Sequence, residues 1–151
     1  MPLVKLSELE QRVRHAVYRT FADGGIPIST IIADECTLPV EDIRDVYARL
    51  HAAHAIVLDS KSGEVRMALP FSAVPTPHRV NSGRRSWFAN CAWDAFGIPA
   101  LLNCDARCES TCADCKSPIS YHVEQGRLVD AHGVVHFAVR ASKWWDDIEF
   151  T

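Results

Sequence analysis

The chain has 151 residues, which is enough for one medium domain or two small ones. Apolar residues make up 48% and charged residues 23%, with a net charge of −3, so the chain has a globular composition and is not a strongly electrostatic binder of nucleic acid or membranes. No apolar run approaches the ~20 residues of a membrane-spanning helix, and the first residues do not form a secretory signal.

Residues 1–70 predict three helices followed by a β-hairpin. Ser7 and Glu10 form a capping-box pattern at the start of the first helix, and the pair Gly24–Gly25 ends it. The stretches "STIIADECTL" and "PVEDIRDVYARLHAAHA" predict the second and third helices, and apolar residues recur at helical spacing in the first and the third. The stretch "AIVLDSKSGEVRMAL" predicts the hairpin. This order is typical of a winged helix-turn-helix unit.

The third predicted helix argues against a DNA-binding role for this unit. It begins with Glu41 and Asp42 and continues with Asp45, where a DNA reader needs Arg, Lys or Asn. We therefore expect the winged-helix unit of residues 1–70 to serve in packing or oligomerisation, which includes a homodimer, rather than in sequence-specific DNA binding.

Residues 71–83 are rich in proline and predict an extended connector to a mixed α/β domain over 84–151. In that domain "SWFANCAWDAFGIPALL" predicts a helix that starts near Ser86, passes Asp94 and breaks before Pro99. "SPISYHVEQGRLVDA" predicts two short strands around an "EQG" turn, and "GVVHFAVRA" predicts a buried strand because it is apolar and β-branched. The expected fold class is α+β.

Cys91 and Asp94, in the stretch "NCAWD", are the first candidate reactive pair. On a helix, residues at i and i+3 project from the same face. A thiolate binds soft metals and electrophiles, and a carboxyl group can carry a proton. The spacing alone favours a buried structural cysteine beside an unrelated surface aspartate.

Four more cysteines, Cys104, Cys108, Cys112 and Cys115, fall within twelve residues. In the reducing cytoplasm, the default location for this chain, such cysteines act as thiols, metal ligands or catalytic groups rather than as disulfides. They can close a tetrahedral zinc site, although the spacing C-x3-C-x3-C-x2-C is unlike common zinc fingers. Iron–sulfur ligation and free or redox-active thiols are the alternatives. The CxxxCxxC spacing of radical-SAM enzymes is also present, but the chain is too short for their barrel.

The stretch "PTPHRVNSGRRSWFANCAWDAFGIPALL" resembles the organomercurial (alkylmercury) lyases, with a looser likeness through "CKSPISYHV" and "VHFAV" to "WW". The resemblance implies a winged-helix unit followed by a small α/β domain. It also implies protonolysis of a carbon–mercury bond, in which Cys91 ligates mercury and Asp94 delivers the proton. No redox cofactor is then required. Mercury is substrate and product, and a small thiol or a dithiol acceptor removes it.

The chain departs from the family pattern at the second catalytic cysteine, which precedes the strand matching "VHF". Here that stretch is "DAHGVVHFAV", and His132 falls near the expected place. Imidazole is a harder donor than thiolate, so it suits mercury less well. One hypothesis is therefore a lyase in which a thiol of the cysteine cluster acts as second ligand.

Two other hypotheses remain open. The first is a non-enzymatic winged-helix protein that binds zinc or mercury through Cys104, Cys108, Cys112 and Cys115 and responds to the metal. The second is a lyase-like scaffold that acts on another organometal substrate.

Overall fold

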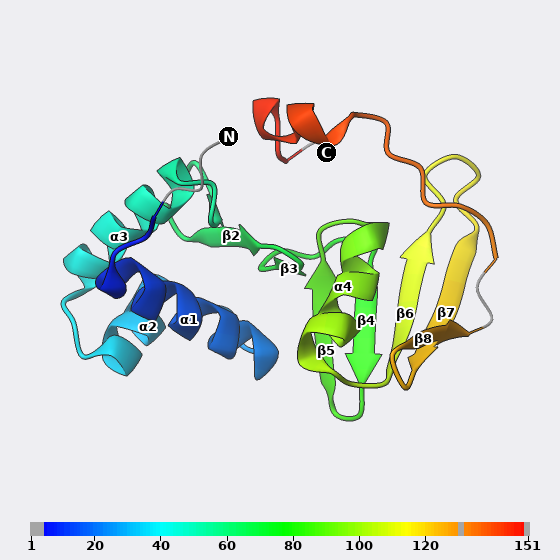
Figure 1. Cartoon of the computed structure of the whole chain (residues 1–151), viewed down its shortest axis with the longest axis horizontal. Coiled ribbons are helices and arrows are strands. Elements are labelled where there is room, and N and C mark those ends of the chain that lie inside the picture. Colours follow the sequence, from blue (N-terminus) through cyan, green and yellow to red (C-terminus); the bar gives the residue numbers. More distant parts are fainter. Residues whose placement is uncertain (1–4, 130–131, 150–151) are drawn as a thin grey trace. The chain divides into compact units, whose positions relative to one another are not determined.

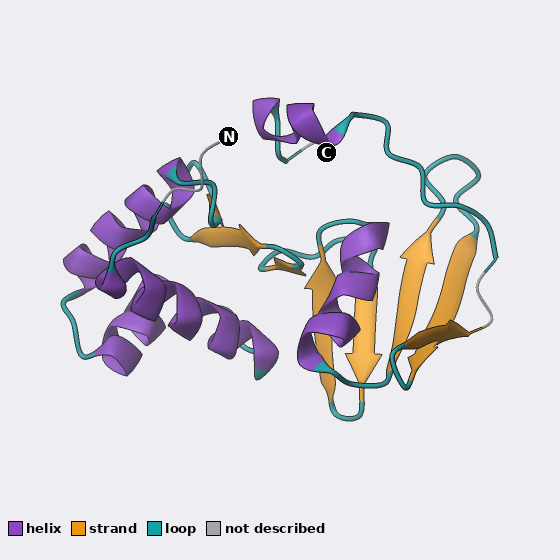
Figure 2. Ribbon diagram, viewed as in Figure 1, coloured by secondary structure: helices purple, strands orange, loops and turns teal. Residues whose placement is uncertain are grey.

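The computed structural model describes residues 5–129 and 132–149, which fall into two compact units, Met1–Ala68 and Leu69–Thr151. Each unit is described by itself (Figures 1 and 2). Within the described residues, no helix has the length and apolar character that crossing a bilayer requires.

The first unit contains the three predicted helices, α1 (Glu8–Ala22), α2 (Ser29–Cys36) and α3 (Val40–Ala52). The capping box is formed, since Ser7 accepts a hydrogen bond from the Glu10 backbone while the Glu10 carboxylate accepts one from the Ser7 backbone. The three helices pack on one another through fully buried apolar side chains, which include Val13, Val17, Ile32, Ile43, Val46, Tyr47 and Leu50. The hydrophobic spacing of the sequence therefore predicted these helices correctly.

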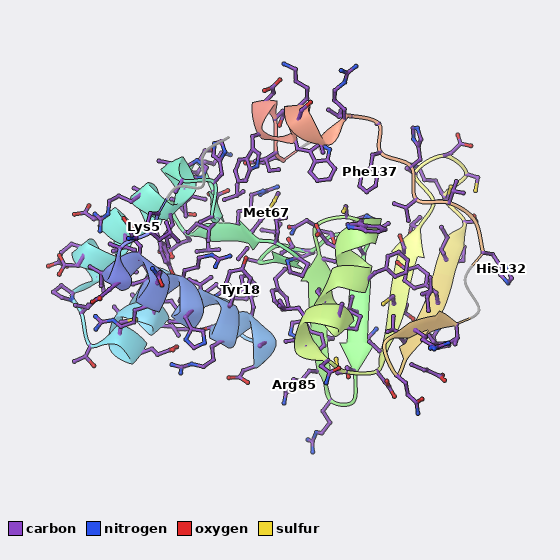
Figure 3. The ribbon with its side chains drawn as sticks, in the orientation of Figure 1. Lys5, Tyr18, Met67, Arg85, His132 and Phe137 are labelled. Carbon is purple, nitrogen blue, oxygen red and sulfur yellow. The ribbon has the colours of Figure 1, made fainter. Side chains whose placement is uncertain are left out.

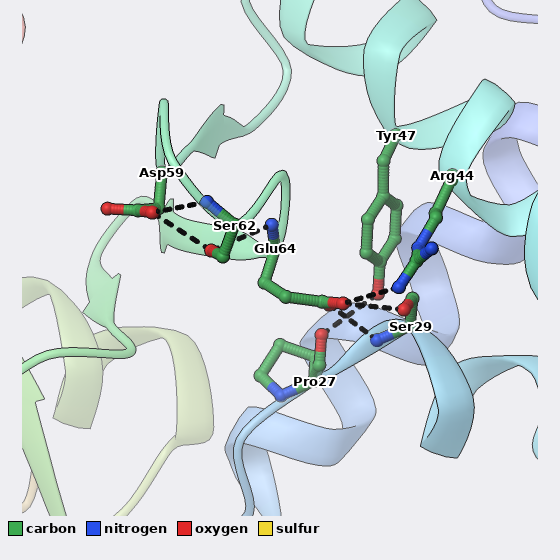
Figure 4. Close-up of polar contacts among 7 residues, drawn as sticks. All are labelled: Pro27, Ser29, Arg44, Tyr47, Asp59, Ser62 and Glu64. Carbon is green, nitrogen blue, oxygen red and sulfur yellow. Dashed lines mark hydrogen bonds and ion pairs between the residues drawn. The ribbon is translucent and has the colours of Figure 1, made fainter.

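The predicted hairpin is also present, as the antiparallel strands β1 (Val57–Leu58) and β2 (Val65–Ala68). The hairpin turn contacts α2 through the side chain of Glu64. Its carboxylate accepts hydrogen bonds of 2.6 Å from both the backbone N–H and the hydroxyl of Ser29 (Figure 4). Ile28 precedes α2 and has no side chain that can cap it. Glu64 thus acts as the cap, from a position 35 residues further along the chain.

The second unit is built on an antiparallel sheet, with one helix, α4 (Ala92–Leu102), packed on strands β4, β5 and β6. The strand order is β3-β5-β4-β6-β7-β8. The strands are β3 (Phe71–Ser72), β4 (Arg79–Ser82), β5 (Arg85–Ala89), β6 (Ala106–Thr111), β7 (Pro118–Glu124) and β8 (Arg127–Val129). The structure is therefore of the mixed α+β class, and residues 71–83, expected to form a connector, contribute β3 and β4.

Three predictions for the second unit were wrong. Ser86 lies in strand β5, because Arg85–Ala89 pairs with β4 around a turn in which Gly83 has a φ of 56°. Helix α4 starts only after this strand, and it continues through Pro99 instead of breaking before it. The stretch 133–140 is not a buried strand but irregular chain, in which the Val134 side chain is 94% exposed.

The predicted strand pair in "SPISYHVEQGRLVDA" is present as β7 and β8, with Gln125 and Gly126 at positive φ in the turn. Asp130 and Ala131, the last two residues of that stretch, lie outside the described residues. The two adjacent tryptophans, Trp144 and Trp145, lie in a short 3-10 helix, Ala141–Asp146.

Candidate functional site

Cys91 lies at the junction between β5 and α4, where it occupies the N-cap position of the helix. Its backbone is extended, and its Sγ accepts a hydrogen bond of 3.4 Å from the backbone N–H of Asp94. A sulfur atom at this position faces the free N–H groups and the positive end of the helix dipole. Both stabilise a thiolate more than a thiol.

The side chains of Cys91 and Asp94 face each other across the first turn, with Sγ 3.5 Å from Oδ2. Both are half-buried. Burial raises the pKa of Asp94, although hydrogen bonds from Cys91 and Asn90 oppose this. Burial also raises the pKa of Cys91, and the neighbouring carboxylate adds to it while the N–H groups of Asp94 and Trp93 oppose it. The pair is therefore arranged to keep one proton between a sulfur and an oxygen.

Asn90 fixes the loop in front of this pair, a role that its position in the sequence did not reveal. Its amide nitrogen donates to the carbonyl oxygens of Pro70 and Phe71, at 3.2 and 3.1 Å. The same side chain hydrogen-bonds the carboxyl group of Asp94. Gly97, one turn beyond Asp94, packs so close to Pro70 that an added Cβ would lie 3.2 Å from the proline ring. The reactive pair is thus held against Pro70 and Phe71, at the start of β3.

Helix α4 is attached to the sheet by two polar contacts from neighbouring strands. Cys108 of β6 and Tyr121 of β7 are directly opposite each other in the sheet. The Cys108 thiol donates to the carbonyl of Ala95, at 3.3 Å, and the Tyr121 hydroxyl donates to that of Ala92, at 3.4 Å. Both contacts fall in the first turns of the helix, so they fix the end that carries the reactive pair.

The Cys108 thiol has a structural task in this arrangement. In a regular helix the N–H of residue 99 would bond to the Ala95 carbonyl, but Pro99 has no N–H. Cys108 is fully buried and replaces that donor. Burial raises the pKa of Cys108 to about 11, which keeps the sulfur protonated and able to donate. Cys108 is therefore a poor candidate for a metal-binding thiolate.

Aromatic side chains line the outer side of the α4 N-terminus. Trp93, 58% exposed, makes edge-to-face contacts with Phe96 of its own helix and with Phe137, at centroid separations of 6.3 and 6.1 Å. Phe137 in turn contacts Trp144 at 5.4 Å, and Phe96 stacks on Tyr121 at 4.4 Å. An exposed apolar surface therefore lies on the helix that carries Cys91 at its N-cap.

Cys112 and Cys115 lie together in the turn between β6 and β7. The turn is closed by backbone hydrogen bonds from Cys112 to Ser117 and from Lys116 to Cys112, and Lys116 has a φ of 59°. The Ser117 Oγ lies 2.9 Å from the Cys115 Sγ, and the Cys112 side chain hydrogen-bonds the same sulfur. The Ser117 hydroxyl and N–H, followed by Cys112, lower the pKa of Cys115 to about 7.

The four clustered cysteines thus occupy three different environments. Cys104 follows the end of α4, Cys108 is buried under α4, and the pair Cys112 and Cys115 faces solvent at the turn. Among the described residues, no three His, Cys, Asp or Glu side chains gather at one point as metal ligands. The four-cysteine metal site remains a prediction.

Two histidines bear on the site in different ways. His132 is exposed and lies on the far side of β7 from α4 (Figure 3). His78 precedes β4, and its Nδ1 is 2.7 Å from the Oγ of Ser110, a buried residue near the end of β6. Burial lowers the pKa of His78. His78 therefore serves as a neutral hydrogen-bonding group between two strands.

Comparisons with known proteins match the second unit to one enzyme family. The family model for alkylmercury lyase (MerB) matches residues 71–151, which include the whole α4 region. The chain is 28% identical to an alkylmercury lyase of Bacillus cereus over 101 residues, 67% of this chain and 45% of the relative. It is 31% identical to one of Staphylococcus epidermidis over 112 residues, 74% of this chain and 49% of the relative.

The chain thus spans about half the length of the curated relatives it matches. A solved structure, described as the mercury-bound form of MerB2, superposes with a TM-score of 0.68 at 24% identity, over 84% of this chain and 61% of that one. At this identity the likeness shows a shared fold. The family match, which covers more than half of the chain and contains Cys91 and Asp94, shows that the chain belongs to the alkylmercury lyase (MerB) family.

Proposed function

We propose that the chain cleaves carbon–mercury bonds by protonolysis at Cys91 and Asp94. The observation that carries this proposal is the contact of 3.5 Å between the Cys91 sulfur and the Asp94 carboxyl group, at the start of a helix that also carries the exposed Trp93. The sulfur would bind the mercury of an organomercurial, and the apolar surface around Trp93 would take the organic group. The names of the matched relatives support a lyase of this kind.

The hydrogen bond between the two side chains supplies the proton. In the resting pair the Cys91 thiol donates to Asp94. When the sulfur binds mercury it gives up this proton, and the half-buried carboxyl group can hold it because burial raises the pKa of Asp94. Asp94 then protonates the carbon as the carbon–mercury bond breaks. The hydrocarbon leaves with the original thiol proton, and Hg(II) stays on sulfur, so no redox cofactor is consumed.

A second thiolate increases the electron density on the mercury-bound carbon, and we propose that a low-molecular-weight thiol in solution supplies it. Cys108 is committed to Ala95 and stays protonated. His132 is exposed and lies beyond β7. An organomercurial in the cell is already bound to a small thiol, because mercury is soft and thiolates are its preferred ligands. Cys91 then needs only to replace or join that ligand.

We also propose a winged-helix-type arrangement for the first unit, based on three helices followed by a hairpin. The first turn of α3 carries Glu41 and Asp42, which disfavour contact with phosphates. We assign this unit to packing or dimer formation rather than to DNA reading. The free cysteines of the chain suit the reducing cytoplasm, which we propose as its compartment.

The test is release of benzene from phenylmercury acetate in an excess of small thiol, followed by gas chromatography. The wild-type protein should release benzene, and Cys91→Ser and Asp94→Ala should each abolish the release. Cys36→Ser is the matched control, because Cys36 is a partly exposed cysteine of α2, in the other unit, and should leave the rate unchanged.

Absence of benzene from the wild-type reaction, in conditions where a known lyase turns over, would reject the proposal. Mercury that binds without cleavage would then favour the alternative, a thiolate metal-binding protein. Benzene release that persists in Cys91→Ser would reject the role of Cys91 as the mercury-binding thiol, but it would still show lyase activity.

A further inference from the structure

The turn between β6 and β7 holds a pair of thiols outside the reactive pair. Cys112 and Cys115 belong to one turn, and the Cys112 side chain hydrogen-bonds the Cys115 sulfur, so the two sulfur atoms already approach each other. Cys115 is exposed and Cys112 is partly exposed. A ligand can therefore reach both sulfur atoms without any rearrangement of the sheet.

The hydrogen bonding of this turn suits a bound cation. The Ser117 hydroxyl, 2.9 Å away, and the Ser117 N–H both point at the Cys115 sulfur. These donors stabilise negative charge on sulfur, as they do around metal-bound thiolates. Lys116 adopts the left-handed conformation that brings the Ser117 N–H back toward the sulfur, and its ammonium group is held by the Ala113 carbonyl.

The number of ligands indicates the type of cation. Zn(II) needs four ligands in a structural site, and within the described part of the chain no third His, Cys, Asp or Glu joins this pair. A soft cation that is satisfied by two thiolates, such as Hg(II), fits better. The two sulfur atoms would then complete its coordination as a chelate.

Strand directions place this turn at the same edge of the sheet as Cys91. Strand β5 is antiparallel to β4, and β4 is antiparallel to β6, so β5 and β6 run in the same direction and end at the same edge. Cys91 follows the end of β5 and Cys112 follows the end of β6 (Figure 1). With only β4 between them, the two strands are separated by roughly 10 Å, or two strand spacings.

We infer that Cys112 and Cys115 form a second, two-thiolate site, which takes up the Hg(II) that cleavage at Cys91 releases. The origin of the ion rests on the proposed function, whereas binding of Hg(II) by the pair does not require cleavage. In the transfer each cysteine thiol loses its proton as an Hg–S bond forms. Each displaced thiolate gains a proton as its Hg–S bond breaks, and no electron is transferred. The protein would thus keep Hg(II) from free solution while Cys91 is regenerated.

The test uses mercuric chloride, one equivalent per protein, in ~1 mM glutathione, followed by desalting and elemental analysis of the retained mercury. The glutathione outcompetes single cysteines, whereas a chelating pair has an effective concentration above the millimolar range. The wild-type protein and Cys91→Ser should retain mercury. Cys112→Ser and Cys115→Ser should each retain roughly tenfold less, and the control Cys36→Ser should behave as wild type. Tryptophan fluorescence checks that each variant is folded.

Alkylation with iodoacetamide and peptide mass spectrometry then locates the ion. One equivalent of Hg(II) should protect Cys112 and Cys115 and leave Cys36 reactive. Equal retention by Cys112→Ser and the wild-type protein, or protection confined to other cysteines, overturns the inference.

A second arm replaces mercuric chloride with phenylmercury acetate, and this arm separates the two proposals. Benzene release with protection of the pair in the wild-type protein supports both. Benzene release without any protection of the pair overturns the second site alone. Binding of Hg(II) by the pair in the mercuric chloride arm, with no benzene release in the phenylmercury arm, overturns the lyase proposal alone.

Discussion

The Cys108 thiol donates a hydrogen bond of 3.3 Å to the carbonyl oxygen of Ala95, which Pro99 leaves without the usual donor of the helix. The three residues form a single structural device, since the proline removes an N–H and the buried sulfur supplies an S–H. The device fixes the helix that begins at Cys91. It also explains why one cysteine of the cluster is buried and stays protonated.

Removal of this thiol should destabilise the second unit. Cys108→Ala leaves a buried carbonyl without a donor and should lower the free energy of unfolding by about 1–3 kcal/mol, whereas Cys108→Ser keeps a donor and should cost less. In a Pro99→Ala background the helix regains its own N–H, so the cost of Cys108→Ala should fall by roughly 1 kcal/mol. Urea titration by tryptophan fluorescence measures this, because all four tryptophans lie in the second unit. An equal loss of unfolding free energy from Cys108→Ala in both backgrounds would show that the thiol does not replace the missing N–H of Pro99.

Asp94→Asn should trap the organomercurial. The variant retains the Cys91 sulfur but has no proton to deliver, so benzene release from phenylmercury should fall by about 10²–10⁴-fold. Intact-protein mass spectrometry should show the phenylmercury adduct on Cys91, and the adduct at this position should be missing from Cys91→Ser. An Asp94→Asn variant that cleaves at the wild-type rate would show that the proton comes from elsewhere.

The same substitution should stabilise the second unit near neutral pH. Burial raises the pKa of Asp94, so the carboxyl group adds stability only while it is protonated, and that contribution is lost as the pH rises through the folded pKa. Asparagine has no charge to bury, and the gain over wild type at pH 7 should be about 0.5–1 kcal/mol. The difference should shrink as the pH is lowered toward 4, in urea titrations at several pH values. A gain that does not vary with pH would contradict this origin.

Cys115 should be the thiol that iodoacetamide alkylates first at neutral pH. Its pKa of about 7 makes it roughly half thiolate there, while burial raises the pKa of Cys91 above its usual value. Ser117→Ala removes the hydroxyl contact and should raise this pKa, so alkylation at pH 7 should slow. Ser120→Ala, a nearby exposed serine of β7, is the control. Mass spectrometry of the alkylated peptides over a pH series gives the midpoint for each cysteine.

Glu64→Ala should loosen the start of α2. The change removes both hydrogen bonds to Ser29, and a lost N-cap costs about 0.5–2 kcal/mol. Hydrogen exchange should accelerate at the amides of the first α2 turn, including Ser29 and Ile32. The exposed Glu124, in the other unit, provides a control of equal charge. Unchanged exchange in α2 would show that Glu64 is not its cap.

Features set by contacts between residues close in the sequence could be predicted, whereas features set by distant contacts could not. The capping box of Ser7 and Glu10, the hydrophobic faces of α1 and α3, and the turn at Gln125 and Gly126 are set by residues within a few positions, and all were predicted. Helix α4 was misjudged at both Ser86 and Pro99. Its start depends on strand pairing with β4, and its passage through the proline coincides with a thiol from another strand.

The candidate site shows the same division. The proximity of Cys91 and Asp94 follows from helix spacing and could be predicted, whereas their role as a reactive pair came only from the resemblance to a family. The separation of the cysteine cluster was not visible in the sequence, because alternation along β6 turns Cys108 inward while the turn exposes Cys115. Asn90 and Tyr121 were missed because each acts through a distant backbone carbonyl.

The stretch 133–140 is held by ring contacts at Phe137 rather than by strand pairing. A strand tolerates no insertion without a change of register, whereas a chain attached through one aromatic ring can be lengthened on either side of it. This stretch is therefore a position where insertions are tolerated. A longer loop that keeps the Phe137 ring beside Trp93 can bring new side chains to the domain without any change in the sheet.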